Sequence, residues 1–167
     1  LWECGIRVPM IVRGPGIKTG SRCDVNVVGY DFLPTFVDLA GGEVAKLREV
    51  DGLSIKPLLR DKENPILAKR YLHFHYPHHR NTAPHSVVLQ GDLKYFRFYE
   101  QPGSHYLYNL KYAIGETENI AAQNKATIAR LSKEMDRYHA AVKACLPKPN
   151  PDASADYQPY DPDKGWD

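Results

Sequence analysis

The chain begins LWECGIRVPMIVRGPG, from Leu1 to Gly16, and this stretch is the most informative part of the sequence. An apolar run rich in β-branched residues extends from Ile6 to Val12, between a glycine and the turn-forming Gly14-Pro15-Gly16. Such a run is typical of a buried strand that ends in a turn. A buried strand needs neighbours on both sides, and no strand precedes this one in the sequence. We therefore expect the chain to be a segment of something larger.

The composition sets the broad class. A hydrophobic fraction of 43% and a charged fraction of 25% are those of an ordinary globular domain. The net charge of +2 gives no reason to expect a nucleic-acid partner. No apolar run approaches the roughly 20 residues of a membrane span. Cys4, Cys23 and Cys145 fit no metal spacing, and we interpret them as buried or free thiols rather than a Cys4–Cys23 disulfide.

The opening stretch resembles a known motif. WECGIRVPMIVRGPG (residues 2–16) is similar to (Y/W)EGGIRVPxIxRxPG of the formylglycine-dependent (type I) sulfatases, which belong to the alkaline-phosphatase-like superfamily. Cys4 stands where that family usually has glycine. YDFLPTFVDLAGG (residues 30–42) resembles its DLxPTxxxLAG helix, and DGLSIKPLL (residues 51–59) its DGxSLxPLL. The resemblance implies that these segments complete a large α/β domain. Glu3 and Arg7 flank the expected buried strand, so we predict that they form a buried ion pair or bond to loop backbone rather than take part in catalysis.

The second half of the chain has the clearest periodicity. Alternating apolar and polar residues predict strands at 71–75, 87–89, 93–99 and 105–110, the last three as an antiparallel meander. Apolar residues spaced by three and four predict a helix from Lys125 to Ala144, with Asn124 as its N-cap, that covers the sheet. Residues 91–94, 107–110 and 115–121 resemble the sulfatase pattern GDxKL…ELYNLxxDxxExxNLA, with Tyr106 and Ala113 in place of two acidic residues.

These observations define an α/β fold, the end of an alkaline-phosphatase-like domain, followed by a small α+β subdomain. The subdomain is expected to be a four-stranded antiparallel sheet packed by one long C-terminal helix. We place the α/β part at residues 1–60, a linker at 61–70, the subdomain at 71–146 and a Pro-rich extended tail at 147–167.

A histidine cluster, HFHYPHHR at residues 73–80, is the candidate binding region. It resembles the WHxPH stretch of some polysaccharide- and glycosaminoglycan-acting sulfatases, which implies that His75, His78 and Arg80 contact an acidic, sulfated sugar. Two alternatives remain open. The segment is a polar turn without a binding role, or His73, His75 and His78 bind a transition metal such as Zn²⁺.

The catalytic groups of the family do not occur in this sequence. The resemblance implies a parent enzyme with a formylglycine made from a C/S-x-P/A-x-R motif and a Ca²⁺ ion held by Asp and Asn or His side chains. None of the three cysteines lies in such a motif. We therefore assign this chain no catalytic residue and no metal ligand, and expect it to be inactive alone.

The resemblance implies a sulfuric ester hydrolase that acts on a sulfated carbohydrate and is periplasmic or extracellular. It also implies that the chain's partner is the amino-terminal part of the sulfatase domain. The alternatives are a non-catalytic carbohydrate-binding or structural module, and a phosphatase or phosphodiesterase relative of the same superfamily.

Overall fold

The computed structural model describes residues 1–79, 82–154 and 156–162. The chain divides into two compact units, one formed by Leu1–Arg7 with Tyr71–Asp167 and the other by Val8–Arg70. Within the part of the chain that is described, no helix combines the length and the apolar character needed to cross a membrane.

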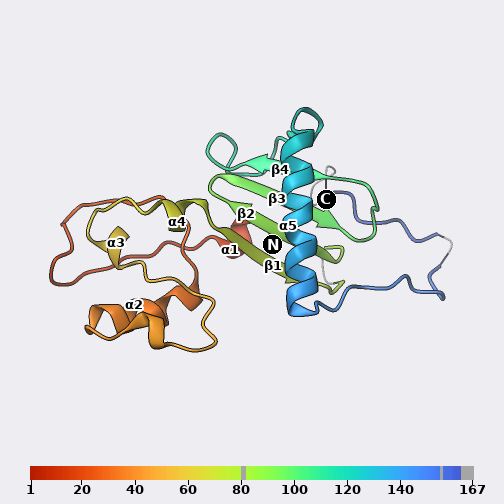
Figure 1. Cartoon of the computed structure of the whole chain (residues 1–167). Helices are drawn as coiled ribbons and strands as arrows, with labels where there is room; N and C mark the ends of the chain where they lie inside the picture. Colours follow the sequence, from red (N-terminus) through yellow and green to blue (C-terminus); the bar gives the residue numbers. More distant parts are fainter. Residues whose placement is uncertain (80–81, 155, 163–167) are drawn as a thin grey trace. The chain divides into compact units, whose positions relative to one another are not determined.

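The first unit is built on a four-stranded antiparallel sheet. Its strands are β1 (Tyr71–Tyr76), β2 (His85–Gln90), β3 (Leu93–Phe98) and β4 (Tyr106–Asn109), which lie in the sheet in chain order. The register pairs His75 with Ser86 and Ser86 with Arg97. The long helix α5 (Lys125–Val142) crosses one face of this sheet (Figure 1). The predicted α+β subdomain architecture is confirmed.

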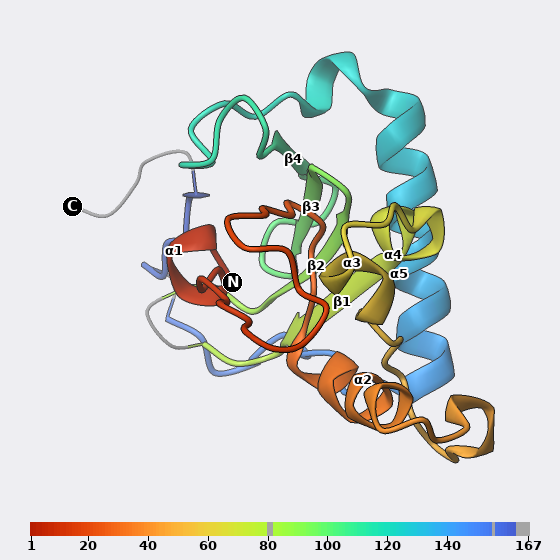
Figure 2. The ribbon, with the colours of Figure 1, turned by 90° about the vertical axis from the view of Figure 1, so that its left-hand side faces the viewer.

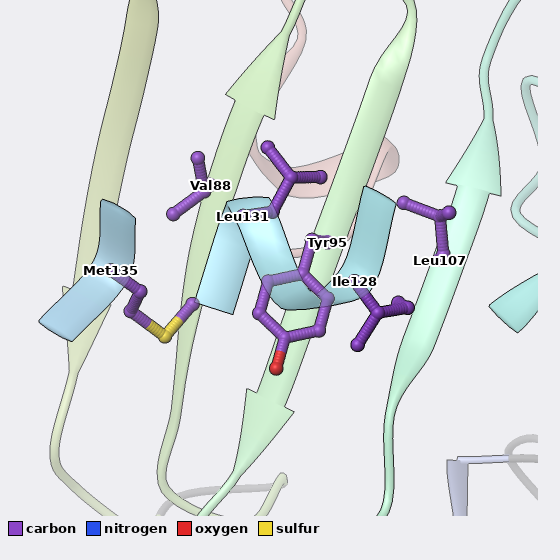
Figure 3. Packing of buried hydrophobic residues seen from close by; sticks show 6 residues of the cluster. All are labelled: Val88, Tyr95, Leu107, Ile128, Leu131 and Met135. Atoms are coloured by element: carbon purple, nitrogen blue, oxygen red, sulfur yellow. The ribbon is translucent and has the colours of Figure 1, made fainter. Parts of the chain in front are cut away.

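The core lies between α5 and the sheet. Ile128, Leu131 and Met135 of the helix pack against one residue from each of three strands, namely Val88, Tyr95 and Leu107 (Figure 3). All six side chains are at most 7% exposed. Burial of an aliphatic side chain of this size contributes about 1.5–3 kcal/mol, so this cluster is the main reason why the helix stays on the sheet.

The last turns of α5 differ from the prediction. The sequence stripe continued through Tyr138, Val142 and Cys145, but the structure buries His139 and leaves Val142 52% exposed. The helix ends at Val142, and Lys143 takes a left-handed conformation with φ +51°. Asn124 occupies the N-cap position, but its side chain makes no capping bond and its amide donates to the Ile120 carbonyl instead.

The opposite face of the sheet is covered by the start of the chain. The short helix α1 (Glu3–Ile6) lies on the side of the sheet away from α5 (Figure 2). The Trp2 ring lies 4.7 Å from Phe96 and 5.8 Å from Tyr108, centroid to centroid. The sheet is therefore buried on both faces, and β2 and β3 accordingly bury side chains at consecutive positions.

The predicted buried strand from Ile6 to Val12 is wrong for this structure. Ile6 ends α1, residues 7–12 form no strand, and Val8 and Ile11 are 79% and 94% exposed. A strand needs a partner for its backbone N–H and C=O groups, and no strand among the described residues pairs with this segment. The apolar run alone does not supply that partner.

The second unit consists of short helices joined by turns. They are η1 (Gly29–Asp31), α2 (Phe32–Leu39), η2 (Val44–Lys46), α3 (Lys56–Leu59) and α4 (Pro65–Lys69). The predicted helix at 30–40 is confirmed as η1 and α2. Helix α4 lies inside the segment predicted as a linker, and the Asn64 side chain caps it by accepting from the Ile66 and Leu67 amides.

Asp31 holds the second unit together. Its fully buried carboxylate accepts hydrogen bonds from the Val28 and Leu53 amides and forms a two-point ion pair with Arg70. Burial alone would raise the pKa of Asp31, but the bonds from Arg70 and the two amides outweigh it and lower the pKa. Asp31 and Leu53 belong to the two sulfatase-like motifs of this unit, so these motifs meet through hydrogen bonds.

Candidate functional site

The histidine-rich segment begins in β1, where His73 faces α5. Its ring stacks on Tyr138 with centroids 4.2 Å apart, and its Nε2 lies 3.1 Å from Glu134 Oε1. Burial lowers the pKa of His73 and outweighs the opposing effect of Glu134. His73 is therefore engaged in docking α5 and is not available for a ligand in this conformation.

His75 belongs to a polar network at the end of the same interface. Its Nδ1 lies 2.7 Å from Ser86 Oγ, and its Nε2 lies 3.0 Å from the Cys145 carbonyl oxygen. Ser86 Oγ is also 2.7 Å from Tyr99 Oη and 3.1 Å from His139 Nε2. Both ring nitrogens of His75 thus have partners within the chain. The sequence did not predict that Ser86, Tyr99 and His139 belong to this polar network.

Of the other two predicted residues, the structure describes only His78, which follows β1. His78 is exposed, and its ring makes an edge contact with Tyr76 at 5.6 Å. Its neighbour His79 lies 3.1 Å from Tyr157 Oη and 3.8 Å from Glu100. Arg80 lies outside the described residues. Among the residues that are described, no hydrogen bond or ion pair joins His75 to His78, and the predicted trio stays a prediction.

The transition-metal alternative finds no support in the geometry. It required His73, His75 and His78 to converge, whereas the first two bond to α5, Ser86 and the segment after the helix. In the described ranges, no group of three or more His, Cys, Asp or Glu side chains could hold a metal ion.

A second cluster, absent from the predictions as a unit, lies on the other face of the sheet. The fully buried Lys94 ammonium is 2.9 Å from Glu3 Oε1 and 2.7 Å from Glu116 Oε1. Glu116 Oε2 accepts the Glu3 amide at 2.7 Å, and Arg7 approaches Glu3 at 3.5 Å. The predicted structural contact between Glu3 and Arg7 is present, but Lys94 lies closer to Glu3 than Arg7 does. Because Lys94 lies on the same face of β3 as Phe96 and Phe98, the strand period could have indicated that it is buried.

An open cleft of about 660 Å³ borders this ion-pair cluster. Trp2, Tyr108 and Tyr160 supply aromatic walls, and Glu3 and Glu116 supply carboxylates. Both carboxylates are already paired with Lys94, so neither is free to act as a general acid or base. The carboxylates of this cleft are therefore not assigned a catalytic role.

The segments that meet in this cluster are the ones with sulfatase-like sequence. Glu3 comes from WECGIRVP, Lys94 from GDLK and Glu116 from the segment after β4. An antiparallel sheet with one packed helix and these motifs in contact defines the carboxyl-terminal part of a sulfatase. Residues 1–141 match the family described as N-sulphoglucosamine sulphohydrolase, C-terminal, and the chain belongs to this family.

Individual relatives agree with the family assignment. The chain is 34% identical over 133 residues to a sulfatase of Formosa agariphila, a match to 74% of this chain and 24% of that protein. It is 33% identical over 138 residues to an N-acetylglucosamine-6-O-sulfatase of Bacteroides thetaiotaomicron, covering 80% of this chain and 24% of the relative. The chain thus spans about a quarter of the length of these relatives.

A solved structure shows the same fold. The protein Ps i-CgsB, in complex with k-i-k-neocarrahexaose, superposes with a TM-score of 0.51 at 27% sequence identity. The superposition covers 65% of this chain and 23% of the other one.

Proposed function

We propose that this chain is the carboxyl-terminal portion of a sulfatase that hydrolyses sulfate esters of a carbohydrate. The observation that carries the proposal is the match of residues 1–141 to the sulfatase family, together with the Glu3–Lys94–Glu116 contacts that join three of its motifs. The carbohydrate substrate is supported by the N-acetylglucosamine-6-O-sulfatase relative and by the structural neighbour that binds a neocarrahexaose.

In this proposal the chain supplies scaffold and not catalysis. Formylglycine and Ca²⁺ would belong to the parent enzyme, because the cysteines here lack the C/S-x-P/A-x-R context and the described residues contain no fitting cluster of ligands. The residues present therefore do not fit either group.

The partner in this proposal is the amino-terminal part of the sulfatase domain. In the second unit, Ile11 is 94% exposed, and Leu33 and Phe36 of α2 are 54% and 63% exposed. Large exposed apolar surfaces mark interaction sites. We propose that the amino-terminal part covers these side chains. The same proposal assigns residues 1–60 to the end of the α/β domain, 61–70 to a linker, 71–146 to the subdomain and 147–167 to a tail.

For substrate contact, the proposal retains His75, His78 and Arg80 but gives them different roles. His78 is exposed and available to a sulfated sugar. His75 would have to give up its bond to Ser86 or to the Cys145 carbonyl before it could bind substrate directly, so we propose that it positions the segment after β1 that carries His78. An export to the periplasm or the extracellular space accompanies this proposal, by analogy with the family.

The decisive experiment uses the chain and its extended form side by side. Purified residues 1–167 should not hydrolyse an aryl sulfate with Ca²⁺ present, whereas a protein extended upstream to include a C/S-x-P/A-x-R motif should. Hydrolysis that follows the 167-residue chain through a sizing column would contradict the division of roles. Binding of a sulfated oligosaccharide by the short chain, with no activity in the extended one, would instead favour a carbohydrate-binding module.

A further inference from the structure

The polar network around Ser86 lies where the end of α5 meets the sheet. Ser86 is 1% exposed and His139 is 7% exposed. The network joins β1 through His75, β2 through Ser86, the end of β3 through Tyr99 and the helix through His139. It also reaches the segment after α5, because His75 Nε2 faces the Cys145 carbonyl oxygen.

One proton order satisfies all four hydrogen bonds of 3.1 Å or less in the network when both imidazoles are neutral. A carbonyl oxygen only accepts, so His75 must carry its proton on Nε2 to bond to Cys145. Its Nδ1 is then an acceptor and takes the single proton of Ser86. Tyr99 and His139 must in turn donate to Ser86 Oγ, which fixes the His139 proton on Nε2. Each proton in the network is therefore used once.

Among the described residues, neither imidazole of this network has a carboxylate as a hydrogen-bond partner. The polar contacts of the two rings are a serine, a tyrosine and a backbone carbonyl. The two imidazoles lie 5.0 Å apart, centroid to centroid, so a charge on one opposes a charge on the other. The titratable groups that act on His139 from the surrounding elements are His73 and His75 of β1, Arg97 of β3 and Asp136 of α5. Asp136 is itself paired with Arg97 at 2.5 Å.

We propose that His75, Ser86 and His139 form an acid-sensitive latch, which holds the end of α5 and the segment after it on the sheet while the His139 imidazole is neutral and releases them when His139 is protonated. The release follows because undocking of the helix end returns the charged ring to water, whereas the docked state buries it. Burial first, and then the neighbouring His75 and Arg97, lower the pKa of His139 from 6.5 to about 4, in agreement with this direction.

The sign of the effect follows from linkage. Because the docked state has the lower pKa, the undocked state binds more protons between about pH 6.5 and pH 4. The latch is therefore fully closed above pH 6.5 and weakens as the pH falls toward 4. With these pKa values the opening equilibrium should rise about tenfold or more between pH 7 and pH 5.

Amide hydrogen exchange of the whole chain tests the latch directly. After correction for intrinsic rates, the amides of residues 139–145 should exchange about tenfold faster at pH 5 than at pH 7, while those around Leu131 change less. His139→Gln retains an N–H donor for Ser86 and does not titrate, so it should abolish this pH dependence. His105→Gln is the matched control, since His105 bonds to Tyr95 away from the latch, and it should keep the dependence.

A second measurement uses the unaltered chain, so it does not depend on whether a variant folds. Long-range ¹H–¹⁵N spectra at pH 7 report the tautomer of each imidazole, and both His75 and His139 should carry the proton on Nε2. A His75 ring with its proton on Nδ1, a charged His139 at pH 7, or an unchanged pH dependence in His139→Gln would each overturn the proposal.

Discussion

Replacement of Lys94 by Met tests whether the buried ion-pair cluster holds the start of the chain on the sheet. Methionine fills nearly the same volume as the lysine stem, so the change removes the charge and leaves little cavity. The Lys94 side chain is fully buried, while Glu3 and Glu116 are 9% and 3% exposed. The variant therefore leaves two carboxylates in a buried position without their shared cation.

The expected loss can be bounded from these contacts. Removal of one partner from a buried ion pair costs about 3–5 kcal/mol, because the remaining charge is uncompensated. Arg7 lies 3.5 Å from Glu3 and is about half exposed, so it offsets part of the cost on that carboxylate. Among the described residues, Glu116 forms no second ion pair, although the Leu1 amino group acts on it electrostatically. We expect Lys94→Met to lower the free energy of unfolding by about 3 kcal/mol.

Urea unfolding followed by circular dichroism measures this loss, with Lys133→Met on the exposed side of α5 as the control. The control should change the unfolding free energy by no more than about 0.5 kcal/mol. The triple variant Lys94→Met, Glu3→Gln and Glu116→Gln removes the stranded charges and should recover more than half of the loss. A Lys94→Met loss below about 1 kcal/mol, or a triple variant less stable than Lys94→Met, would refute the electrostatic explanation.

Three further substitutions address other features. Lys143→Gly should stabilise the first unit by about 0.5–1 kcal/mol in the same urea assay, because the backbone at position 143 is left-handed. The control Lys133→Gly, at an exposed position in the middle of α5, should destabilise the unit by about 1 kcal/mol. Stabilisation at both sites would contradict the backbone explanation. Gly52→Ala should unfold the second unit, because a Cβ at position 52 would lie 2.0 Å from the Tyr30 carbonyl oxygen. Loss of amide protection around Asp31 would detect this unfolding. Retained protection would show that the segments around Gly52 and Tyr30 separate easily. In the full-length enzyme, His78→Ala should lower kcat/KM on the sulfated sugar about tenfold or more and leave a small aryl sulfate nearly unaffected; equal losses on both substrates would place His78 outside the sugar subsite.

The elements with a local signal could be predicted from the sequence. The alternation in residues 93–99 identified β3 and its two faces, and the spacing of Ile128, Leu131 and Met135 identified the buried side of α5. These patterns are reliable because a strand or helix with one apolar side must bury that side against another element. The motif at residues 2–16 also identified the family, although not the local structure that those residues adopt here.

Features that depend on partners far apart in the chain could not be predicted and became visible only in the folded structure. The run from Ile6 to Val12 has a strand-like composition, but pairing requires another strand, and composition does not create one. Lys94 meets Glu3 across 91 residues, and Ser86 meets His139 across 53. Nothing local in the sequence specifies such contacts. A hydrogen bond or ion pair of this kind exists only after the packed core has brought its two groups together and excluded water from between them.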